Sequence, residues 1–317
     1  MTAIILINWN GADDTLACLA SLEKASGDFC VVVADNGSTD DSVQRLSAYI
    51  ATSSLRVELL PLGHNWGFAV GNNRAVAHAR ETFHPDSYML LNNDTEVAPD
   101  FMAKLQAIRT EHPDLKVLGP LICYWSDKNR IWSCGGRLVL GSRKSFYRDA
   151  DVTALPDVTM MEVSFISGCA LFVDASLMDA DGRLLTERFF FGEEDYEFAL
   201  RMRREGEKMA IVRDSVIWHK VASSARRVQT RTTLGRDYLY YLGRLIAARD
   251  YYNPVAFLLI RLLTASSCLR WFVRDGLTKR QSLRLSLRLF CDARTKVGIS
   301  YEDFKSAVLD GTAFATL

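Results

Sequence analysis

Polar residues follow several short apolar runs of this sequence, at the points where the runs end. The stretch YMLLNNDTEV, residues 88–97, passes directly from an apolar run into Asn92, Asn93 and Asp94. A sheet gains nothing by burying such side chains, so we expect them to face a ligand. Asp94 suits Mg²⁺ or Mn²⁺ held against a diphosphate, because these ions need few protein carboxylates and keep phosphate and water ligands. Asn92 and Asn93 would offer amides to a ribose or a phosphate.

A second carboxylate, Asp35, follows the apolar run of VVVADNGSTD. Its oxygens are suited to accept an imide N–H such as that of uracil or thymine. The alternative is that Asp35 or Ser38 only caps the following helix. Because Ser38 and Asp40 already supply caps, we favour the base-binding role for Asp35.

A third group of carboxylates lies in FFFGEEDYEFALRMRREG, where Glu193, Glu194 and Asp195 open a predicted helix. Three adjacent carboxylates repel one another, which raises the pKa of some of them and suits a general base that takes a proton from a hydroxyl. The alternative is an acidic first turn that only complements the helix dipole. His219, at the end of SVIWHK, is either structural or a ligand that suits Mn²⁺ better than Mg²⁺.

The elements that must position these residues alternate along the first part of the chain. Short apolar runs are separated by segments of helical period, and the runs are 3–7, 30–34, 57–60, 88–91 and 116–118. This alternation predicts an α/β fold with a mostly parallel sheet flanked by helices, in which ligands bind beyond the carboxyl ends of the strands. After residue 119 the pattern predicts a mixed or antiparallel extension. We expect Asp35, Asp94 and Asp195 to share one crevice, with Asp195 free of any internal ion pair; a carboxylate locked into such a pair would contradict this interpretation.

Two features of the helices are also predicted. Asp13 or Asp14 is expected to cap the first helix, and the proline of APDFMAKLQAIRT is expected at the first position of its helix.

Composition bounds the class of protein. The 317 residues are 49% hydrophobic and 24% charged, as in a soluble globular protein. Seven cysteines without a CxxC pattern indicate a reducing compartment. The start MTAIILINWNG is typical of a strand and not of a signal peptide, and no apolar run is long enough to predict a membrane-spanning helix.

The net charge of zero hides an asymmetry. Residues 1–218 carry 21 Lys and Arg against 31 Asp and Glu, whereas residues 219–296 carry 16 against 4. We therefore predict a first domain over 1–222 and a basic, amphipathic helical region over 223–317. The segment 251–292 interleaves Leu, Phe and Trp with arginines, and SLRLSLRLF fits a helix or a strand. It would pack on the first domain or a second subunit as a homodimer, or dock on a membrane surface; no motif supports nucleic-acid binding.

Taken in order, the motifs of this chain resemble those of family 2 glycosyltransferases with the GT-A fold, especially the bacterial rhamnosyltransferase-like branch. The resemblance extends from residue 3 to about residue 245. The motifs are NWNG, VVADNGSTD, NWGFAVGNN, LLNNDTEV, IWSCGG, FISGCALFV, FGEEDYEFALRMRREG, VIWHK and RDYLYYLGR.

The resemblance implies roles for single residues. Asp35 would bind the nucleobase, with Trp9 and Asn65 stacking on it and contacting it. Asn92 to Asp94 look like a variant DxD motif in which Asp94 is the carboxylate on the metal, and His219 matches a late histidine that reaches the metal. The ED pair Glu194 and Asp195 would supply the base. The remaining nucleotide-binding positions implied are Asn8, Gly71, Asn92 and Asn93. Asp174 stands where family members often carry a basic residue.

A protein of this kind would be an inverting glycosyltransferase that uses Mn²⁺ or Mg²⁺. It would move a sugar from a UDP- or dTDP-sugar to a hydroxyl of a glycan or lipid-linked acceptor in bacterial surface polysaccharide assembly. Its place would be the cytoplasm, including the inner face of the cell membrane. Two alternatives remain open: a catalytically silent subunit that binds a sugar nucleotide or glycan, and a nucleotidylyltransferase. The second would want a Gly-rich basic loop after the first strand, which NWNGADD does not supply.

Overall fold

The structure is a computed structural model that describes residues 1–221 and 234–314. Four parallel strands form one half of the main sheet, in the order β4, β1, β2, β3. Their bounds are β1 Thr2–Asn8, β2 Phe29–Asp35, β3 Val57–Pro61 and β4 Ser87–Asn92. The parallel register sets Asn8 opposite Asp35 and Ile7 opposite Asn92, so the polar junctions lie at one edge.

The other half of the sheet is mixed, as predicted. β11 (Ala170–Asp174) runs antiparallel to both β4 and β6 (Val117–Tyr124), and β6 pairs in parallel with β12 (Met209–His219). The remaining strands pair antiparallel with these or with each other: β5 Thr95–Val97, β7 Asp127–Ser133, β10 Met160–Val163, and the separate hairpin of β8 Gly136–Val139 and β9 Ser142–Ser145.

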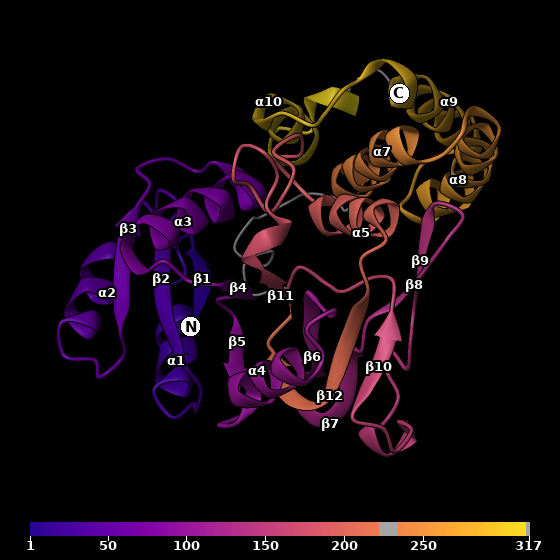
Figure 1. The fold of residues 1–317 in the computed structure, drawn as a ribbon. Helices are drawn as coiled ribbons and strands as arrows, with labels where there is room; N and C mark the ends of the chain where they lie inside the picture. The colour runs from indigo at the N-terminus through magenta and orange to yellow at the C-terminus, as the bar shows by residue number, and fades with distance from the viewer. Residues whose placement is uncertain (222–233, 315–317) are drawn as a thin grey trace.

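Helices cover both faces of the sheet (Figure 1). Successive side chains of a strand point to opposite faces, so Ile4 and Leu6 pack with α1 and α4 while Ala3 and Ile5 pack with α3. The helices of the first part are α1 Ala12–Leu22, α2 Ser42–Ile50, α3 Gly67–Phe83, α4 Phe101–Glu111 and α5 Glu194–Glu205.

Two predicted helix starts are wrong. Neither Asp13 nor Asp14 caps α1, because the helix already begins at Ala12 behind Gly11. Pro99 does not occupy the first turn of α4, since Asp100 lies between it and the helix.

Three long helices follow residue 233: α7 Leu234–Tyr251, α8 Pro254–Arg274 and α9 Lys279–Thr295. The sequence SLRLSLRLF is therefore helical. Short elements complete the chain: η1 Val152–Ala154, η2 Ala175–Leu177, α10 Tyr301–Phe304, η3 Lys305–Leu309 and η4 Thr312–Phe314. The predicted domain boundary at 222/223 falls outside the described residues.

Helix α5 lies between the sheet and the later helices (Figure 1). Phe198 and Met202 join the core on the sheet, while Tyr196, Ala199 and Leu200 pack with the core of α7, α8 and α9. The helix that carries the predicted base is thus held from both sides.

Helix α8 differs from the sequence expectation that no helix could span a membrane. Among the described residues, Pro254–Arg274 is the one helix long and apolar enough to do so by length and composition. Arg261 interrupts the apolar run, but arginine is a good helix former and the helix continues through it. Its side chain is buried, with the guanidinium bonded to the carbonyl of Phe290.

Candidate active site

The junction after β1 and β2 is a closed hydrogen-bond network around Asp35. Ser38 N donates to Asp35 Oδ1 at 2.9 Å, and Ser38 Oγ and Asn8 Nδ2 donate to Oδ2 at 2.6 and 2.7 Å. Asp35 is buried. It therefore shapes the turn after β2, but neither Asp35 nor Ser38 caps α2, because that helix follows Asp41 and has no side-chain cap bond. Contact with a nucleobase stays a prediction.

The same network continues to β4. Thr15 Oγ1 donates to Asn8 Oδ1 at 2.7 Å and accepts from Asn93 Nδ2 at 2.8 Å. Asn8 and Asn93 are both buried, and their amides bond to side chains at neighbouring strand ends. Of the two amides of LLNNDTEV, Asn92 is the half-buried one. Contact of Asn92 and Asn93 with a ligand stays a prediction.

The loop before α3 closes the side of the junction. Asn36 Nδ2 donates to Asn65 Oδ1 at 3.2 Å and Asn36 Oδ1 accepts from Trp66 N at 3.0 Å. Gly71 packs against the Asn36 side chain, where an added Cβ would lie 3.5 Å from its amide atoms. Trp9 and Asn65 are half-buried at this loop and junction. The nucleotide-binding positions suggested by the sequence thus border one edge of the sheet.

Asp94 and His219 come together although 125 residues separate them. His219 Nε2 lies 3.1 Å from Asp94 Oδ1, and each side chain is less than a tenth exposed. Burial opposes a charged imidazolium, but the neighbouring Cys169 and Asp94 outweigh it and raise the pKa of His219 to about 10. The ring also packs edge-on against Trp132 at 4.6 Å between centroids.

This pair supplies a carboxylate and, once His219 has lost a proton to make room for the ion, an imidazole; that donor set fits Mn²⁺ and, less well, Mg²⁺. Within residues 1–221 and 234–314, no group of three or more His, Cys, Asp or Glu side chains is placed to hold a metal ion. An ion at Asp94 and His219 would therefore depend on substrate and water for its other ligands.

Asp195 is held by two partners. Arg143 Nη1 donates to its Oδ1 at 2.9 Å, and Gly168 N donates to its Oδ2 at 3.1 Å. The expectation that Asp195 carries no internal ion pair is wrong. Arg143 belongs to the β8–β9 hairpin, which reaches across to the start of α5 and neutralises the acidic cluster there.

Of the two glutamates beside Asp195, Glu193 is buried and Glu194 is half-buried. Glu193, in a left-handed conformation with φ +68°, binds Arg143 at 2.7 Å and Arg244 of α7 at 3.3 Å. Burial raises the pKa of Glu193 in spite of both arginines. Burial and then the charge of Asp195 raise the pKa of Glu194 to about 8. Glu194 Oε2 is buried and has no hydrogen-bond partner in the described part of the chain.

Gly168 and Cys169 join the Asp195 and Asp94 sites. Gly168 N binds Asp195, and an added Cβ at Gly168 would lie 3.4 Å from Asp195 Cβ. The next residue, Cys169, accepts a hydrogen bond from Asn92 N through its carbonyl at 2.8 Å. Asp195 is therefore on the same edge of the sheet as Asn92 and its neighbour Asp94, as predicted.

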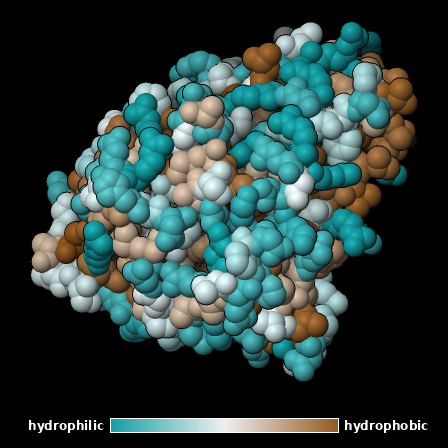
Figure 2. All heavy atoms as spheres, viewed as in Figure 1, coloured by the Kyte–Doolittle hydropathy of each residue, from teal (hydrophilic) through white to brown (hydrophobic). Residues whose placement is uncertain are grey.

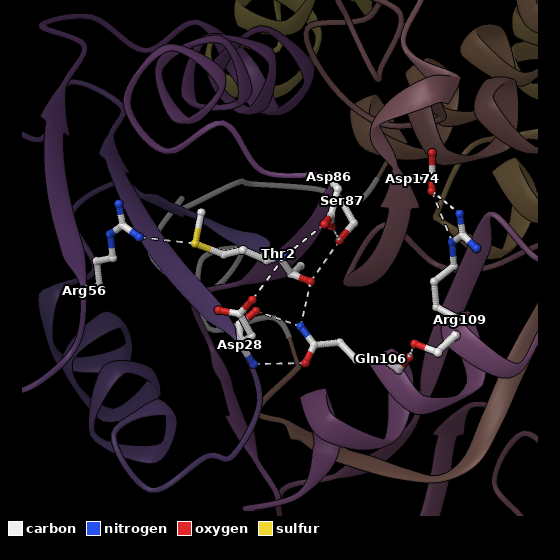
Figure 3. Close-up of polar contacts among 10 residues, drawn as sticks. Thr2, Asp28, Arg56, Asp86, Ser87, Gln106, Arg109 and Asp174 are labelled. Atoms are coloured by element: carbon white, nitrogen blue, oxygen red, sulfur yellow. Dashed lines mark hydrogen bonds and ion pairs between the residues drawn. The ribbon is translucent and has the colours of Figure 1, made fainter. Parts of the chain in front are cut away.

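Asp174 lies elsewhere. It pairs in register with Ser87 at the opposite end of β4, and Arg109 Nε donates to its carboxylate at 3.1 Å. Figure 3 shows this ion pair near the bonded side chains of Thr2, Ser87 and Gln106, at the amino-terminal edge of β1 and β4. The Asp174 carboxylate therefore joins elements at that edge and does not belong to the candidate site.

Sequence reasoning missed four residues of this site: Thr15, Arg143, Cys169 and Arg244. Cys169 stood in a quoted motif, FISGCALFV, and its place just before β11 was a usable signal. Arg143 gave none, because one arginine in a polar hairpin has no characteristic spacing.

A family model supplies the decisive comparison. The model of glycosyl transferase family 2 matches residues 3–166, more than half of the chain. The chain belongs to glycosyl transferase family 2. The matched segment contains Asp35 and Asp94, whereas Asp195 and His219 lie beyond it.

Relatives of this family 2 member are distant. An N-acetylglucosaminyl-diphospho-decaprenol L-rhamnosyltransferase of Mycobacterium tuberculosis is 28% identical over 229 residues, covering 66% of this chain and 72% of the relative. The low-salt glycan biosynthesis hexosyltransferase Agl10 of Haloferax volcanii is 24% identical over 205 residues, covering 64% of this chain and 62% of the relative. An uncharacterised protein of Sinorhizobium fredii, 24% identical over 237 residues, is covered for only 25% of its length. The chain thus spans less than two thirds of some of its relatives.

Solved structures show the GT-A fold. TarS residues 1–349 of S. aureus, in complex with UDP-GlcNAc, gives a TM-score of 0.58 at 17% identity, covering 92% of this chain and 81% of that one. A mannosyltransferase of Pyrobaculum calidifontis, in complex with GDP-Man and Mn²⁺, gives a TM-score of 0.57 at 15% identity, covering 93% of this chain and 86% of that one. At these identities the likeness establishes the fold alone.

Proposed function

We propose that this protein transfers a sugar from a UDP- or dTDP-sugar to an acceptor hydroxyl, with inversion at the anomeric carbon. The observation that carries the proposal is the chain of contacts from Asp195 through Gly168 and Cys169 to Asn92 and Asp94. It sets a candidate base beside a candidate metal site at the edge of the sheet where nucleotides bind in open α/β folds.

The nucleotide would bind over the β1–β2 junction. Asn8 and Ser38 fix the orientation of Asp35, and a carboxylate oxygen keeps acceptor capacity beyond one donor. An imide N–H of the base is then the donor that Asp35 would accept, while the half-buried Trp9 would stack on the ring.

Asp94 and His219 would hold Mn²⁺ or Mg²⁺. The bound ion would supply Lewis-acid stabilisation of the negative charge that grows on the leaving diphosphate. Asp94 would provide the carboxylate that balances the ion, and burial of both side chains would keep water from weakening this attraction.

Asp195 would take the proton of the acceptor hydroxyl. The hydroxyl oxygen would bond to the anomeric carbon while the bond from that carbon to the diphosphate breaks. In the structure the Arg143 guanidinium is paired with Asp195 Oδ1, the oxygen that would otherwise be open to the acceptor hydroxyl. A donor diphosphate would compete for the same guanidinium. We infer that Arg143 orients Asp195, and that this pair loosens when the donor is bound.

The acceptor would be a hydroxyl of a glycan or of a lipid-linked sugar, in the assembly of bacterial surface polysaccharide at the cytoplasmic side of the membrane. The rhamnosyltransferase and hexosyltransferase names of the relatives favour a hexose or deoxyhexose. In this proposal residues 1–222 form the catalytic domain and residues 223–317 a helical region that supports α5.

A thermal-shift screen tests the donor and the metal. UDP, dTDP, GDP and their sugars are compared with and without Mn²⁺, because a ligand that binds only the folded state raises the melting temperature. We expect a shift with a uridine or thymidine nucleotide that grows with Mn²⁺, and no added effect of Mn²⁺ in Asp94→Asn. Asp214→Asn, an exposed change on the same strand as His219, is the control. Binding of GDP alone, or an Mn²⁺ effect that survives Asp94→Asn, would contradict the proposal.

A catalytically silent binding subunit would pass this screen, so hydrolysis of the donor separates the two functions. We expect Mn²⁺-dependent release of nucleoside diphosphate from the sugar nucleotide that gives the largest shift. Binding without any release, with or without acceptor sugars, would favour the silent subunit.

A further inference from the structure

Helices α8 and α9 expose a continuous set of large apolar side chains. We call the surface formed by these residues the α8–α9 face. Its members are Val255, Leu258, Leu259, Leu262, Leu263, Trp271 and Val273 of α8 and Leu283 and Leu287 of α9. Val255 is 79% exposed and Leu262 is 52% exposed. Figure 2 shows a broad brown surface at the upper right, where Figure 1 places α8.

The two helices form a hairpin that fixes which side faces outward. Ser282 Oγ donates to the carbonyl of Leu269 at 2.7 Å, and Arg261 Nε donates to that of Phe290 at 3.2 Å. The inward side of α8 is filled by Ile260, Arg261, Cys268 and Phe272. The outward leucines are therefore not an alternative core, and they cost free energy wherever they meet water.

The same packing distinguishes lying on a membrane from crossing one. The Arg261 guanidinium is buried under the Phe290 ring, 3.6 Å from its centroid, and bonded to the Phe290 carbonyl. Helix α8 is thus fixed along its length to α9. A helix attached in this way presents one apolar side, which suits an interfacial position.

Charge indicates what covers the α8–α9 face. Between residues 252 and 291 the chain has seven basic residues and one acidic residue, Asp275. The exposed basic residues lie beside the apolar ones in the second half of α8 and in α9, and they are Arg270, Arg274, Lys279, Arg280, Arg284 and Arg288. Two copies packed face to face would bring these arginines together, whereas anionic lipid headgroups supply the opposite charge.

We propose that the α8–α9 face docks on an anionic lipid bilayer, with the leucines in the interfacial layer and the arginines among the lipid phosphates. Helix α8 carries the apolar contact and α9 carries most of the charge. The proposal does not depend on the glycosyltransferase function, because it concerns binding to lipid without any donor.

The test is co-sedimentation of the full-length chain with phosphatidylcholine vesicles, with and without phosphatidylglycerol. We expect binding that requires phosphatidylglycerol and falls as salt rises. Leu262→Gln should weaken it about tenfold, since a buried leucine contributes that much to partitioning. Val158→Gln, at an exposed valine before β10, should leave it unchanged.

A second pair of variants tests the charge. Arg284→Glu should weaken binding to the anionic vesicles about tenfold, because each basic residue near such a surface contributes measurably. Lys24→Glu, at an exposed lysine beyond α1, should not. All four substituted positions, Leu262, Val158, Arg284 and Lys24, are exposed, so the melting temperatures of the variants should be unchanged. If Leu262→Gln has a lower melting temperature, Leu287→Gln replaces it in the test.

Two results would overturn the proposal. One is binding that ignores phosphatidylglycerol or is absent. The other is a dimer in sedimentation velocity that Leu262→Gln dissociates and that vesicles do not, which would assign the α8–α9 face to a second copy of this chain. An inactive protein that still binds vesicles would leave it standing and count only against the proposed function.

Discussion

The guanidinium of Arg143 contacts two carboxylates at once, with Nη2 2.7 Å from Glu193 Oε1 and Nη1 2.9 Å from Asp195 Oδ1. One side chain of a hairpin thereby sets the charge balance of the whole acidic start of α5. Tyr240 of α7 also bonds to this guanidinium.

Arg143→Gln should lower both stability and turnover. Glu193 would keep Arg244, so the loss in free energy of unfolding should be about 1–3 kcal/mol, less than for a fully orphaned buried charge. Asp195 would lose its orientation, and kcat should fall at least about tenfold at a temperature where the variant is folded. The control is Arg130→Gln, whose pair with Asp149 is about half exposed and should contribute less than about 1 kcal/mol. Unchanged kcat in Arg143→Gln would remove Arg143 from the site.

Asp195→Asn should separate binding from transfer. The amide keeps the shape of the carboxylate but cannot accept the proton, so donor binding by calorimetry should stay normal while transfer falls by about 10²–10⁴. Asp214→Asn serves as the control. Near-normal turnover of Asp195→Asn would exclude it as the base.

Glu194 should make stability fall as pH rises. Its pKa is raised to about 8 in the folded protein, so between the unfolded value near 4.5 and pH 8 the folded state binds more protons than the unfolded state. The free energy of unfolding then decreases with pH by on the order of 1 kcal/mol per unit. In Glu194→Gln this contribution to the slope should be lost, which urea unfolding of both proteins at pH 5 and pH 8 would measure. Glu205→Gln, at the exposed end of α5, should keep it; an unchanged slope in Glu194→Gln would contradict the assignment.

Asp174 should affect the pH dependence of stability in the direction opposite to Glu194. Burial alone would raise its pKa, but hydrogen bonds from Ser176 and Arg109 outweigh burial and hold it below the usual 3.8. Its stabilisation is present above the unfolded pKa and is lost as pH falls through the folded one. Asp174→Asn should therefore cost about 1–2 kcal/mol at pH 7 and progressively less below pH 4. Asp114→Asn, which breaks a pair with Lys208 at the surface, should cost less at pH 7. A cost for Asp174→Asn that does not depend on pH would contradict this account.

The sequence predicted the sheet and its polar edge because apolar runs and their polar ends are local features. Asn8, Asp35 and Asn92 lie at strand ends for that reason. The partners of the carboxylates were not predictable, since Asp195 meets Arg143 and Gly168 only through tertiary packing. The bond from Asn93 Nδ2 to Thr15 was unpredictable for the same reason, since 78 residues separate the two.

Helix α7 contributes Arg244 and Tyr240 to the contacts of the acidic cluster at the start of α5. It also carries Gly243, where an added Cβ would lie 3.4 Å from Glu193 Cβ. The two regions of the chain therefore cannot be exchanged independently between homologues. A chimera that keeps this sheet but takes another protein's C-terminal helices would need an arginine and a glycine at these neighbouring positions, or it would leave Glu193 poorly neutralised in the interior.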